Sequence, residues 1–289
     1  MSGGHNFRGQ RDMTRAIVGT GEHVYQVIHP FGTVPEGVNF GPVSHVATDS
    51  ADRVYAFQRR DPPVLVFDSQ GDFLTSWGSG LFVDAHGIFI TPMDEIFLID
   101  RDAHEVMKFN TEGEVLLRLG TRDRPSLQGP FNHPADLAVT ANGEIFIADG
   151  YGNSRVHRFS AQGELINSWG SPGSGPGEFS TPHGIWVDPS DRVFVCDREN
   201  NRVQIFDIEG GYLAEWRDLY HPMDIYQDSQ GTFFVTDQTP RITMLNAAGE
   251  LVARGRTPYN AHGMWIDSQG DIYLAGQVEG ITKLVKAQG

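Results

Sequence analysis

The chain has 289 residues, 39% of them hydrophobic, and a mean hydropathy of −0.32, which are values typical of a soluble globular protein with a sizeable core. Its formal net charge of −15 at pH 7 argues against nucleic acid and anionic membranes as partners, because both are bound through basic patches. We therefore expect no nucleic acid and no membrane among its partners.

The sequence also indicates the cellular compartment of the protein. Its single cysteine, Cys196, cannot form an intrachain disulfide, and the apolar run at residues 193–196 makes it a predicted core residue. The amino-terminal segment lacks the apolar stretch of a signal peptide, and no run of about 18 apolar residues occurs. We expect a cytoplasmic protein.

In chain order, residues 1–20 are polar and rich in glycine, and we expect a flexible arm there. Residues 24–28 (VYQVI) predict a single strand without a local partner. No linker interrupts the remainder, so residues 21–289 are expected to form one domain. Within it the chain repeats itself six times, at roughly 41–82, 83–127, 128–176, 177–218, 219–258 and 259–289.

Each repeat predicts four short strands, because β-branched and aromatic residues alternate with turn formers. The third strand is the most regular, at residues 64–67, 106–109, 156–159, 203–206, 242–245 and 281–284. Six such units predict an all-β, six-bladed β-propeller. The last repeat stops after its third strand, so the strand at residues 24–28 is expected to complete it and close the ring.

One register position alternates between histidine and other residues. Asp100 and Asp197 each lie 14 residues after a histidine, and this offset aligns all six repeats. The aligned column consists of Ser44, His86, Ala135, His183, Met223 and His262. Residues on alternate blades are related by about threefold symmetry, so the three imidazoles can converge on the propeller axis. Three imidazoles with an open fourth position suit catalytic Zn²⁺, although other divalent transition metals remain possible and a histidine near a strand end can be purely structural.

Further candidates lie where the second strands end. Tyr151 follows the strand of the third repeat, and a tyrosine can act as a general acid or base. Arg59, Arg101 and Arg198 stand directly after their second strands, where an arginine can hold a substrate carboxylate through paired hydrogen bonds. Asp-Arg pairs at blade turns can also do no more than cap the loop.

The repeats resemble the NHL family, whose members are six-bladed propellers. Two stretches, PADLAVTANGEIFIADGYGNSRVHRFSAQGELINSWG and PGEFSTPHGIWVDPSDRVFVCDRENNRVQIF, are similar to a narrower group, the peptidyl-alpha-hydroxyglycine alpha-amidating lyases. The motifs DGYGNSR and DRENNR are the most specific, and the resemblance covers roughly residues 41–289.

The resemblance implies a zinc-dependent lyase that cleaves the C–N bond of a carbinolamide to give an amide and an aldehyde. It implies His86, His183 and His262 as zinc ligands. Tyr151 would be the base or a metal-bound phenolate, and Arg59 and Arg198 would bind substrate or stabilise charge. The implied partner is a small-molecule substrate, which can carry a carboxylate.

Two departures from the family alter these expectations. The family has an aspartate, a ligand of structural calcium, directly after the third histidine, and here Gly263 stands there, so Ca²⁺ is doubtful. A substrate-contacting methionine two residues before that histidine is replaced by Asn260, which implies a more polar pocket. We count Asn260, Arg101 and Met223 as candidate substrate-binding residues.

Two other functions remain open. A propeller metallohydrolase of the lactonase kind would use a site resembling a calcium site built from Glu, Asn and Asp. A non-catalytic NHL interaction module would use one face of the propeller and would need neither metal nor alternating histidines.

Overall fold

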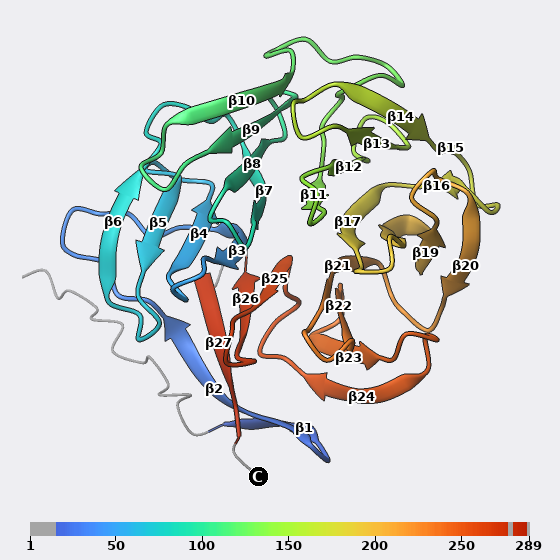
Figure 1. Ribbon diagram of the computed structural model, residues 1–289. Helices are drawn as coiled ribbons and strands as arrows, with labels where there is room; N and C mark the ends of the chain where they lie inside the picture. Colours follow the sequence, from blue (N-terminus) through green and yellow to red (C-terminus); the bar gives the residue numbers. More distant parts are fainter. Residues whose placement is uncertain (1–15, 277–279, 288–289) are drawn as a thin grey trace, which may run out of the picture.

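The computed structural model describes residues 16–276 and 280–287, and nearly all of its regular structure is β-strand, arranged in six blades (Figure 1). This confirms the predicted six-bladed propeller. Blade one contains β3 (Val43–Thr48), β4 (Val54–Gln58), β5 (Val64–Phe67) and β6 (Phe73–Trp77); blade two contains β7 (Ala85–Ile90), β8 (Ile96–Asp100), β9 (Glu105–Phe109) and β10 (Val115–Gly120); blade three contains β11 (Asp136–Val139), β12 (Ile145–Asp149), β13 (Arg155–Phe159) and β14 (Leu165–Trp169).

The second half of the chain repeats the pattern, with one short addition. Blade four contains β17 (Pro182–Val187), β18 (Val193–Asp197), β19 (Arg202–Phe206) and β20 (Tyr212–Trp216); blade five contains β21 (Pro222–Gln227), β22 (Phe233–Asp237), β23 (Arg241–Leu245) and β24 (Leu251–Arg256); blade six contains β25 (Gly263–Ile266), β26 (Ile272–Gly276) and β27 (Gly280–Lys286). Between blades three and four, β15 (Ser171–Pro172) and β16 (Glu178–Phe179) form a short parallel pair that the repeat pattern did not predict.

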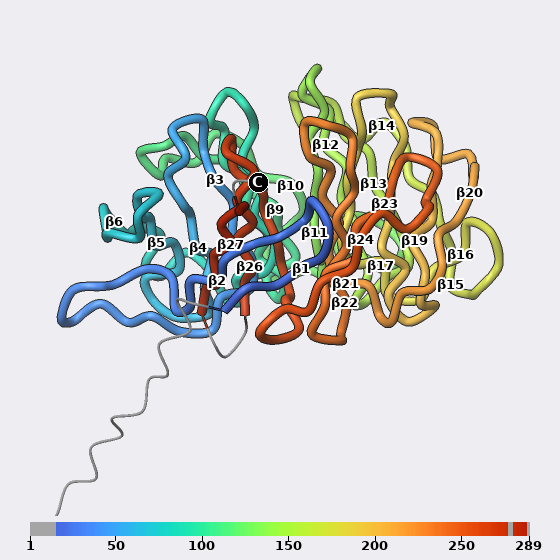
Figure 2. The backbone as a smooth tube through the Cα atoms, turned by 90° about the horizontal axis from the view of Figure 1, so that it is seen from below, coloured from blue at the N-terminus to red at the C-terminus, as the bar shows by residue number. Residues whose placement is uncertain are grey.

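The ring closes as expected. Strand β2 (His23–Phe31) pairs antiparallel with β27 and becomes the fourth strand of blade six, so both ends of the chain meet in one sheet (Figure 2). Strand β1 (Ile17–Thr20) pairs with β2 as a fifth strand. It falls within the predicted amino-terminal arm, the rest of which, residues 1–15, lies outside the described residues. Strand β2 thus covers the edge of β27 that would otherwise be open.

The inner strands β3, β7, β11, β17, β21 and β25 surround the axis, each in contact with the next and β25 with β3 (Figure 1). The first three strands of each blade are mostly buried on both faces, which explains why their sequences are continuous apolar runs. The outer strands are half exposed, as in β10 and β20. The channel is therefore formed by buried strands whose first residues face the axis.

The tryptophans at the ends of outer strands pack against aromatic residues of the next blade. Trp77 of blade one lies 5.2 Å from the ring of Phe109 in blade two, and Trp169 of blade three lies 5.9 Å from Phe206 in blade four. A turn glycine of the following blade covers each indole. Gly210 has φ +88°, and a Cβ there would lie 2.6 Å from Trp169, so both the backbone and the packing require glycine.

The far end of the channel is closed by aromatic side chains three residues beyond the histidine register. Phe89 lies 5.3 Å from Trp265, and Trp265 lies 5.1 Å from Tyr226, between ring centroids. Trp186 completes the group at 4.5 Å from Tyr226 and 6.0 Å from Phe89. Access to the axial histidines is consequently from the face that carries the loops after the second strands.

Buried acidic residues at the ends of second strands shape those loops. Each accepts a hydrogen bond from a backbone N–H of the segment that leads into the inner strand of its own blade. The pairs are Asp100 with Val83 and Asp84, Asp149 with Asn132, Asp197 with Ser180, and Asp237 with Tyr220, at 2.8–3.2 Å. The recurrent aspartate of the sequence is thus structural, and it fixes the entrances of blades two to five.

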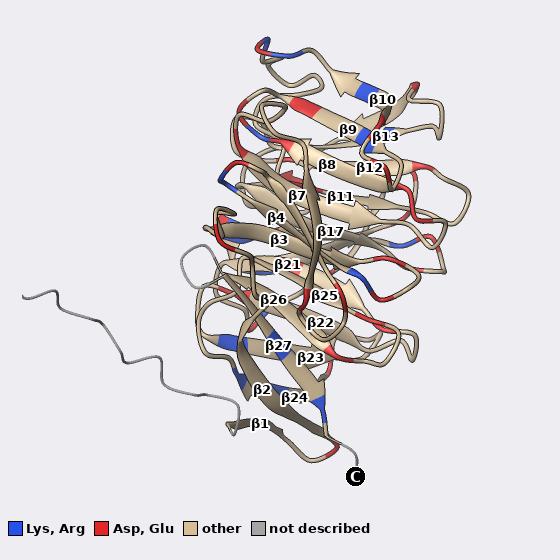
Figure 3. Cartoon of the chain, turned by 90° about the vertical axis from the view of Figure 1, so that its left-hand side faces the viewer, with Lys and Arg blue, Asp and Glu red and all other residues tan. Residues whose placement is uncertain are grey.

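Acidic side chains lie mainly in turns, with Lys and Arg interspersed among them (Figure 3). Within residues 16–276 and 280–287 there is no helix with the length and apolarity needed to cross a membrane.

Replacing Asp197 by alanine should destabilise the propeller strongly. Asp197 is fully buried and its Oδ2 lies 2.8 Å from Nε of Arg202, which is itself only 2% exposed. Removing the carboxylate takes away one of the two carboxylate partners of this buried guanidinium and leaves the donors of Ser180, Asn200 and Gln204 without their acceptor, so we expect a loss of about 3–5 kcal/mol in the free energy of unfolding. Urea denaturation measures it. The control, Glu164→Ala, removes an exposed acid and should leave the midpoint near that of the wild type; equal midpoints for both variants would contradict the assignment.

Candidate metal centre

The structure brings the three histidines of the alternating column together on the axis. His86 lies on β7, His183 on β17, and His262 directly before β25, and their side chains are 1%, 2% and 5% exposed. Their ring centroids are 4.8–5.3 Å apart, and one nitrogen of each lies within 4.8 Å of the others. We call these three residues the histidine ring.

Each imidazole is oriented by a backbone carbonyl of the next blade. Nδ1 of His86 lies 2.7 Å from the Ala135 oxygen. The same bond joins His183 to Met223 at 2.7 Å and His262 to Ser44 at 2.8 Å. A carbonyl only accepts, so Nδ1 carries the proton and the lone pair of Nε2 is directed to the axis. The acceptors are the backbone carbonyls of Ala135, Met223 and Ser44, the non-histidine members of the aligned column.

Burial keeps the histidine ring neutral. The pKa of His86 lies well below its usual range, mainly because the imidazole is desolvated and secondly because the other two histidines are close. The pKa of His183 is lowered in the same way, by desolvation first and by His262 second. Burial lowers the pKa of His262 to about 3. Neutral imidazoles are the form that binds metal, and few protons compete with a cation for them near pH 7.

The Tyr151 hydroxyl lies beside the ring, 3.1 Å from Nε2 of His86 and 3.0 Å from Nε2 of His183. Its single proton can satisfy one of these two acceptors. Nε2 of His262 is buried, and among the described residues it has no hydrogen-bond partner. Buried lone pairs without donors are costly, and they fit a bound cation.

The arginines surround this tyrosine. Arg198, in the 3-10 turn Arg198–Asn200, donates to the Tyr151 hydroxyl at 3.3 Å. The guanidinium carbons of Arg198 and Arg101 lie 5.2 and 5.1 Å from the centre of its ring. Arg59 donates to Ser44 Oγ at 2.9 Å and so reaches the inner strand of blade one. Positive charge is therefore gathered at the mouth of the channel.

Asp84 was missed by the sequence reasoning. Its carboxylate joins Arg59 at 3.2 Å and Arg101 at 3.0 Å, so it positions both guanidinium groups. It precedes the inner strand of blade two. Because the chain has 37 acidic residues, nothing in the sequence marks this one as part of a site.

The remaining candidates are less central. Met223 contributes its carbonyl to the histidine ring, and its side chain is nearly buried, with Sδ 3.8 Å from Nε2 of Gln238. Asn260 is exposed, and among the described residues no interaction joins it to the histidine ring. Recesses adjoin the site, one of about 370 Å³ lined by Arg59 and one of about 750 Å³ lined by Tyr151.

A second polar group lies one register position deeper in the channel. His45, Asp136 and Asp224 also place one possible ligand atom each within 4.8 Å of one another. None of these three residues was among the candidate site residues predicted from the sequence. Their shared offset from Ser44, Ala135 and Met223 was the signal that could have found them.

Comparison with known proteins agrees with this architecture. A family model described as a 6-bladed beta-propeller matches residues 117–244. The chain is 35% identical over 216 residues to NHL repeat-containing protein 3 of Homo sapiens, covering 67% of this chain and 61% of that protein. It is 31% identical over 221 residues to peptidyl-alpha-hydroxyglycine alpha-amidating lyase 1 of Drosophila melanogaster, covering 64% of this chain and 40% of that one. The chain thus spans less than two thirds of the length of these relatives.

A solved gluconolactonase from Xanthomonas campestris superposes with a TM-score of 0.72 at 13% identity, covering 91% of this chain and 90% of that one. At that identity the likeness shows the fold alone. Together with the six closed blades, the sequence relatives identify the chain as an NHL-repeat six-bladed β-propeller, homologous to NHL repeat-containing protein 3 and to the peptidyl-alpha-hydroxyglycine alpha-amidating lyases.

Proposed function

We propose that this propeller is a zinc-dependent lyase that cleaves the C–N bond of a small carbinolamide, giving an amide and an aldehyde. The observation that supports it most is the convergence of three buried, neutral Nε2 atoms beside the Tyr151 hydroxyl. The likeness to an amidating lyase of Drosophila melanogaster supports the reaction class.

His86, His183 and His262 would hold the metal, and their bonds to Ala135, Met223 and Ser44 would keep the three lone pairs aimed at it. Zinc bound there would supply Lewis-acid polarisation of the substrate hydroxyl. The aromatic closure of the channel below keeps that hydroxyl on the side of Tyr151.

Tyr151 would remove the proton of the substrate hydroxyl. The carbonyl of the aldehyde forms as the C–N bond breaks, and the electron pair of that bond goes to the nitrogen. The nitrogen then takes up the proton that Tyr151 removed, which yields the amide and restores the tyrosine. Arg198 and Arg101, both close to the Tyr151 ring, would stabilise the negative charge that develops during the transfer.

Arg59 would bind the substrate. It lines a recess together with Ala85, the residue directly before His86, and pairs with Asp84, which holds its guanidinium in place. A carboxylate on the substrate can pair with Arg59 through two parallel N–H bonds. An anionic ligand would compete there with Asp84, Asp102 and Glu199, the carboxylates that already pair with the arginines at the channel mouth.

A second candidate is a non-catalytic interaction module, favoured by the likeness to NHL repeat-containing protein 3. In that case the histidine ring would be a purely structural link between blades. The lactonase alternative has less support, because its likeness to this chain is one of fold only.

The purified chain should contain zinc at its histidine ring, and the triple variant His86→Ala/His183→Ala/His262→Ala should lose one equivalent, because it removes all three nitrogen ligands. Inductively coupled plasma mass spectrometry measures the metal, and circular dichroism checks the fold. The control, His133→Asn/His221→Asn, removes two histidines outside the ring with a residue that tolerates their positive φ, and it should keep the full content. Unchanged content in a folded triple variant would refute the metal centre and favour the interaction module.

Tyr151→Phe should lower kcat on a carbinolamide by about 10²–10⁴-fold, because the proton acceptor is lost. Metal content should be unchanged, since the three imidazoles remain. Steady-state kinetics with an N-acyl-α-hydroxyglycine, a carbinolamide that carries a carboxylate, measures the effect. Tyr220→Phe, at a half-exposed tyrosine, is the matched control and should retain wild-type kcat. Wild-type turnover by Tyr151→Phe would remove this residue from the chemistry.

A further inference from the structure

The face of the propeller opposite the histidine ring carries a wide hollow. Its wall is formed by the turns that follow the inner strands of blades one, two, three, five and six. The hollow has about 1570 Å³ of empty volume, counting the part open to solvent, which is more than twice the 750 Å³ of the recess beside Tyr151. It is large enough for a small organic molecule. We call it the aromatic cup, after the four side chains of its floor, Phe89, Trp186, Tyr226 and Trp265.

The four rings of the floor are tilted against one another. The planes of neighbouring rings are inclined by 43–82°. Phe89 and Trp265 are each 8% exposed, and Trp186 and Tyr226 are half-buried. The Tyr226 hydroxyl donates to the Ile266 carbonyl at 3.2 Å, which fixes its ring between blades five and six. A floor of tilted rings offers π-faces from several blades, and such faces attract cations.

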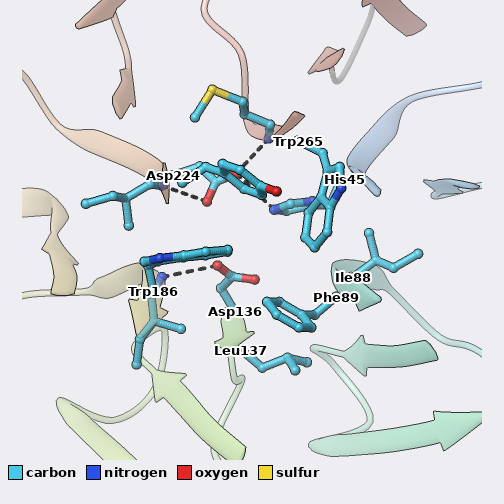
Figure 4. A pocket seen from close by; sticks show the side chains of 12 residues that line it. His45, Ile88, Phe89, Asp136, Leu137, Trp186, Asp224 and Trp265 are labelled. Carbon is cyan, nitrogen blue, oxygen red and sulfur yellow. Dashed lines mark hydrogen bonds and ion pairs between the residues drawn. The ribbon is translucent and has the colours of Figure 1, made fainter. Parts of the chain in front are cut away.

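The rings separate the aromatic cup from the deeper polar group of the channel, which consists of His45, Asp136 and Asp224. Figure 4 shows aromatic and polar side chains around one small cavity between the two. Nε2 of His45 lies 3.0 Å from Oδ2 of Asp224, and that oxygen also accepts from Met264 N–H at 2.6 Å. The Asp224 carboxylate is thus engaged within the channel, and a ligand of the cup would meet the rings instead.

The wall of the aromatic cup carries more negative than positive charge. Four aspartates line it, together with one lysine, Lys286. Two of these carboxylates have cationic partners, since Asp49 lies 2.6 Å from Nε of Arg53 and Asp267 lies 3.9 Å from Nζ of Lys283. The other two, Asp52 and Asp228, form no ion pair with any residue that the structure describes, so the cup has a net negative charge.

The carboxylate of Asp228 acts directly on the floor. Its Oδ1 accepts from the neutral N–H of Gln230 at 3.0 Å, which leaves its charge uncompensated. Burial raises the pKa of Tyr226, and the nearby carboxylates of Asp228 and Asp267 raise it further. Tyr226 is therefore a neutral phenol near pH 7, and the negative potential of the wall extends over its ring.

This combination suits an organic cation better than a metal ion. In the described part of the chain, side chains converge as metal ligands at the histidine ring and at the deeper polar group, and neither set includes a carboxylate of the cup. The negative charge of the cup is instead spread around its wall, above an aromatic floor. An alkylammonium ion can place its methyl or methylene groups on the rings while its charge stays close to the carboxylates.

We propose that the aromatic cup binds a small organic cation, a quaternary ammonium ion or a protonated alkylamine, on the face opposite the histidine ring. The rings supply the contact with the alkyl groups, and the aspartates of the wall select for positive charge. The site does not depend on the proposed lyase activity.

Isothermal titration calorimetry of the full chain with choline tests the proposal. Choline should bind about tenfold more tightly than its neutral isostere dimethylbutanol, in which carbon replaces the nitrogen, because the two share their shape and differ in charge. The triple variant of the histidine ring should bind choline as the wild type does, since the cup lies on the other face. Equal affinities for choline and dimethylbutanol, or no binding of choline, would overturn the proposal.

Two substitutions at Tyr226 test the contribution of its ring. Tyr226→Phe keeps the π-face and should retain most of the choline affinity, whereas Tyr226→Leu removes it and should weaken binding about tenfold. Circular dichroism checks that both variants fold. Wild-type affinity in a folded Tyr226→Leu protein would overturn the proposed site.

Asp228→Asn tests the charge of the wall without removing a ring. The amide oxygen can still accept the backbone bonds of the turn, so the fold should persist, and choline binding should weaken about threefold while dimethylbutanol binding stays the same. The matched control is Asp207→Asn, because Asp207 accepts the same kind of turn bonds outside the cup, and it should keep the wild-type affinity. An equal loss in both variants, or choline binding that disappears only with the histidine ring, would place the ligand elsewhere and overturn the site.

Discussion

The hydrogen bond from each ring histidine to a backbone carbonyl of the next blade is the interaction on which the site depends. It joins His86 to Ala135, His183 to Met223 and His262 to Ser44, and so links blades two, four and six to three, five and one. The bond contributes to ring closure and sets the imidazole tautomer at the same time. Closure matters because the inner strands converge on one axis only when blade six, completed by β2, meets blade one.

Most of the fold could be predicted because each copy of the repeat supports the strand assignment of the others. The predicted third strand at residues 64–67 is β5, and the others lie within one or two residues of the observed bounds. The closing strand was predicted because the last repeat lacked a fourth strand. Strands β1 and the β15–β16 pair were not predicted, since each occurs once and no other repeat supports it.

The histidine ring could be predicted for the same reason, since an alternating column is visible without coordinates. Asp84 could not, because its role comes from reaching across to arginines on two different blades. His45, Asp136 and Asp224 shared a register, but aspartates in a chain with 37 acidic residues are unremarkable until their burial is known. Asn260, two residues before His262, is exposed, and its contact with substrate stays a prediction.

The two axial groups are joined through the backbone. Ser44, Ala135 and Met223 supply the carbonyls that orient the histidine ring, and the next residue on each strand supplies His45, Asp136 or Asp224. Contacts that hold the deeper side chains in place therefore also hold the carbonyls above them, because the two groups belong to adjacent residues of the same strand. Below both groups the rings of Phe89, Trp186, Tyr226 and Trp265 separate the axial groups from the opposite face of the propeller. The histidine ring is consequently approached from the end where Tyr151 and the arginines stand.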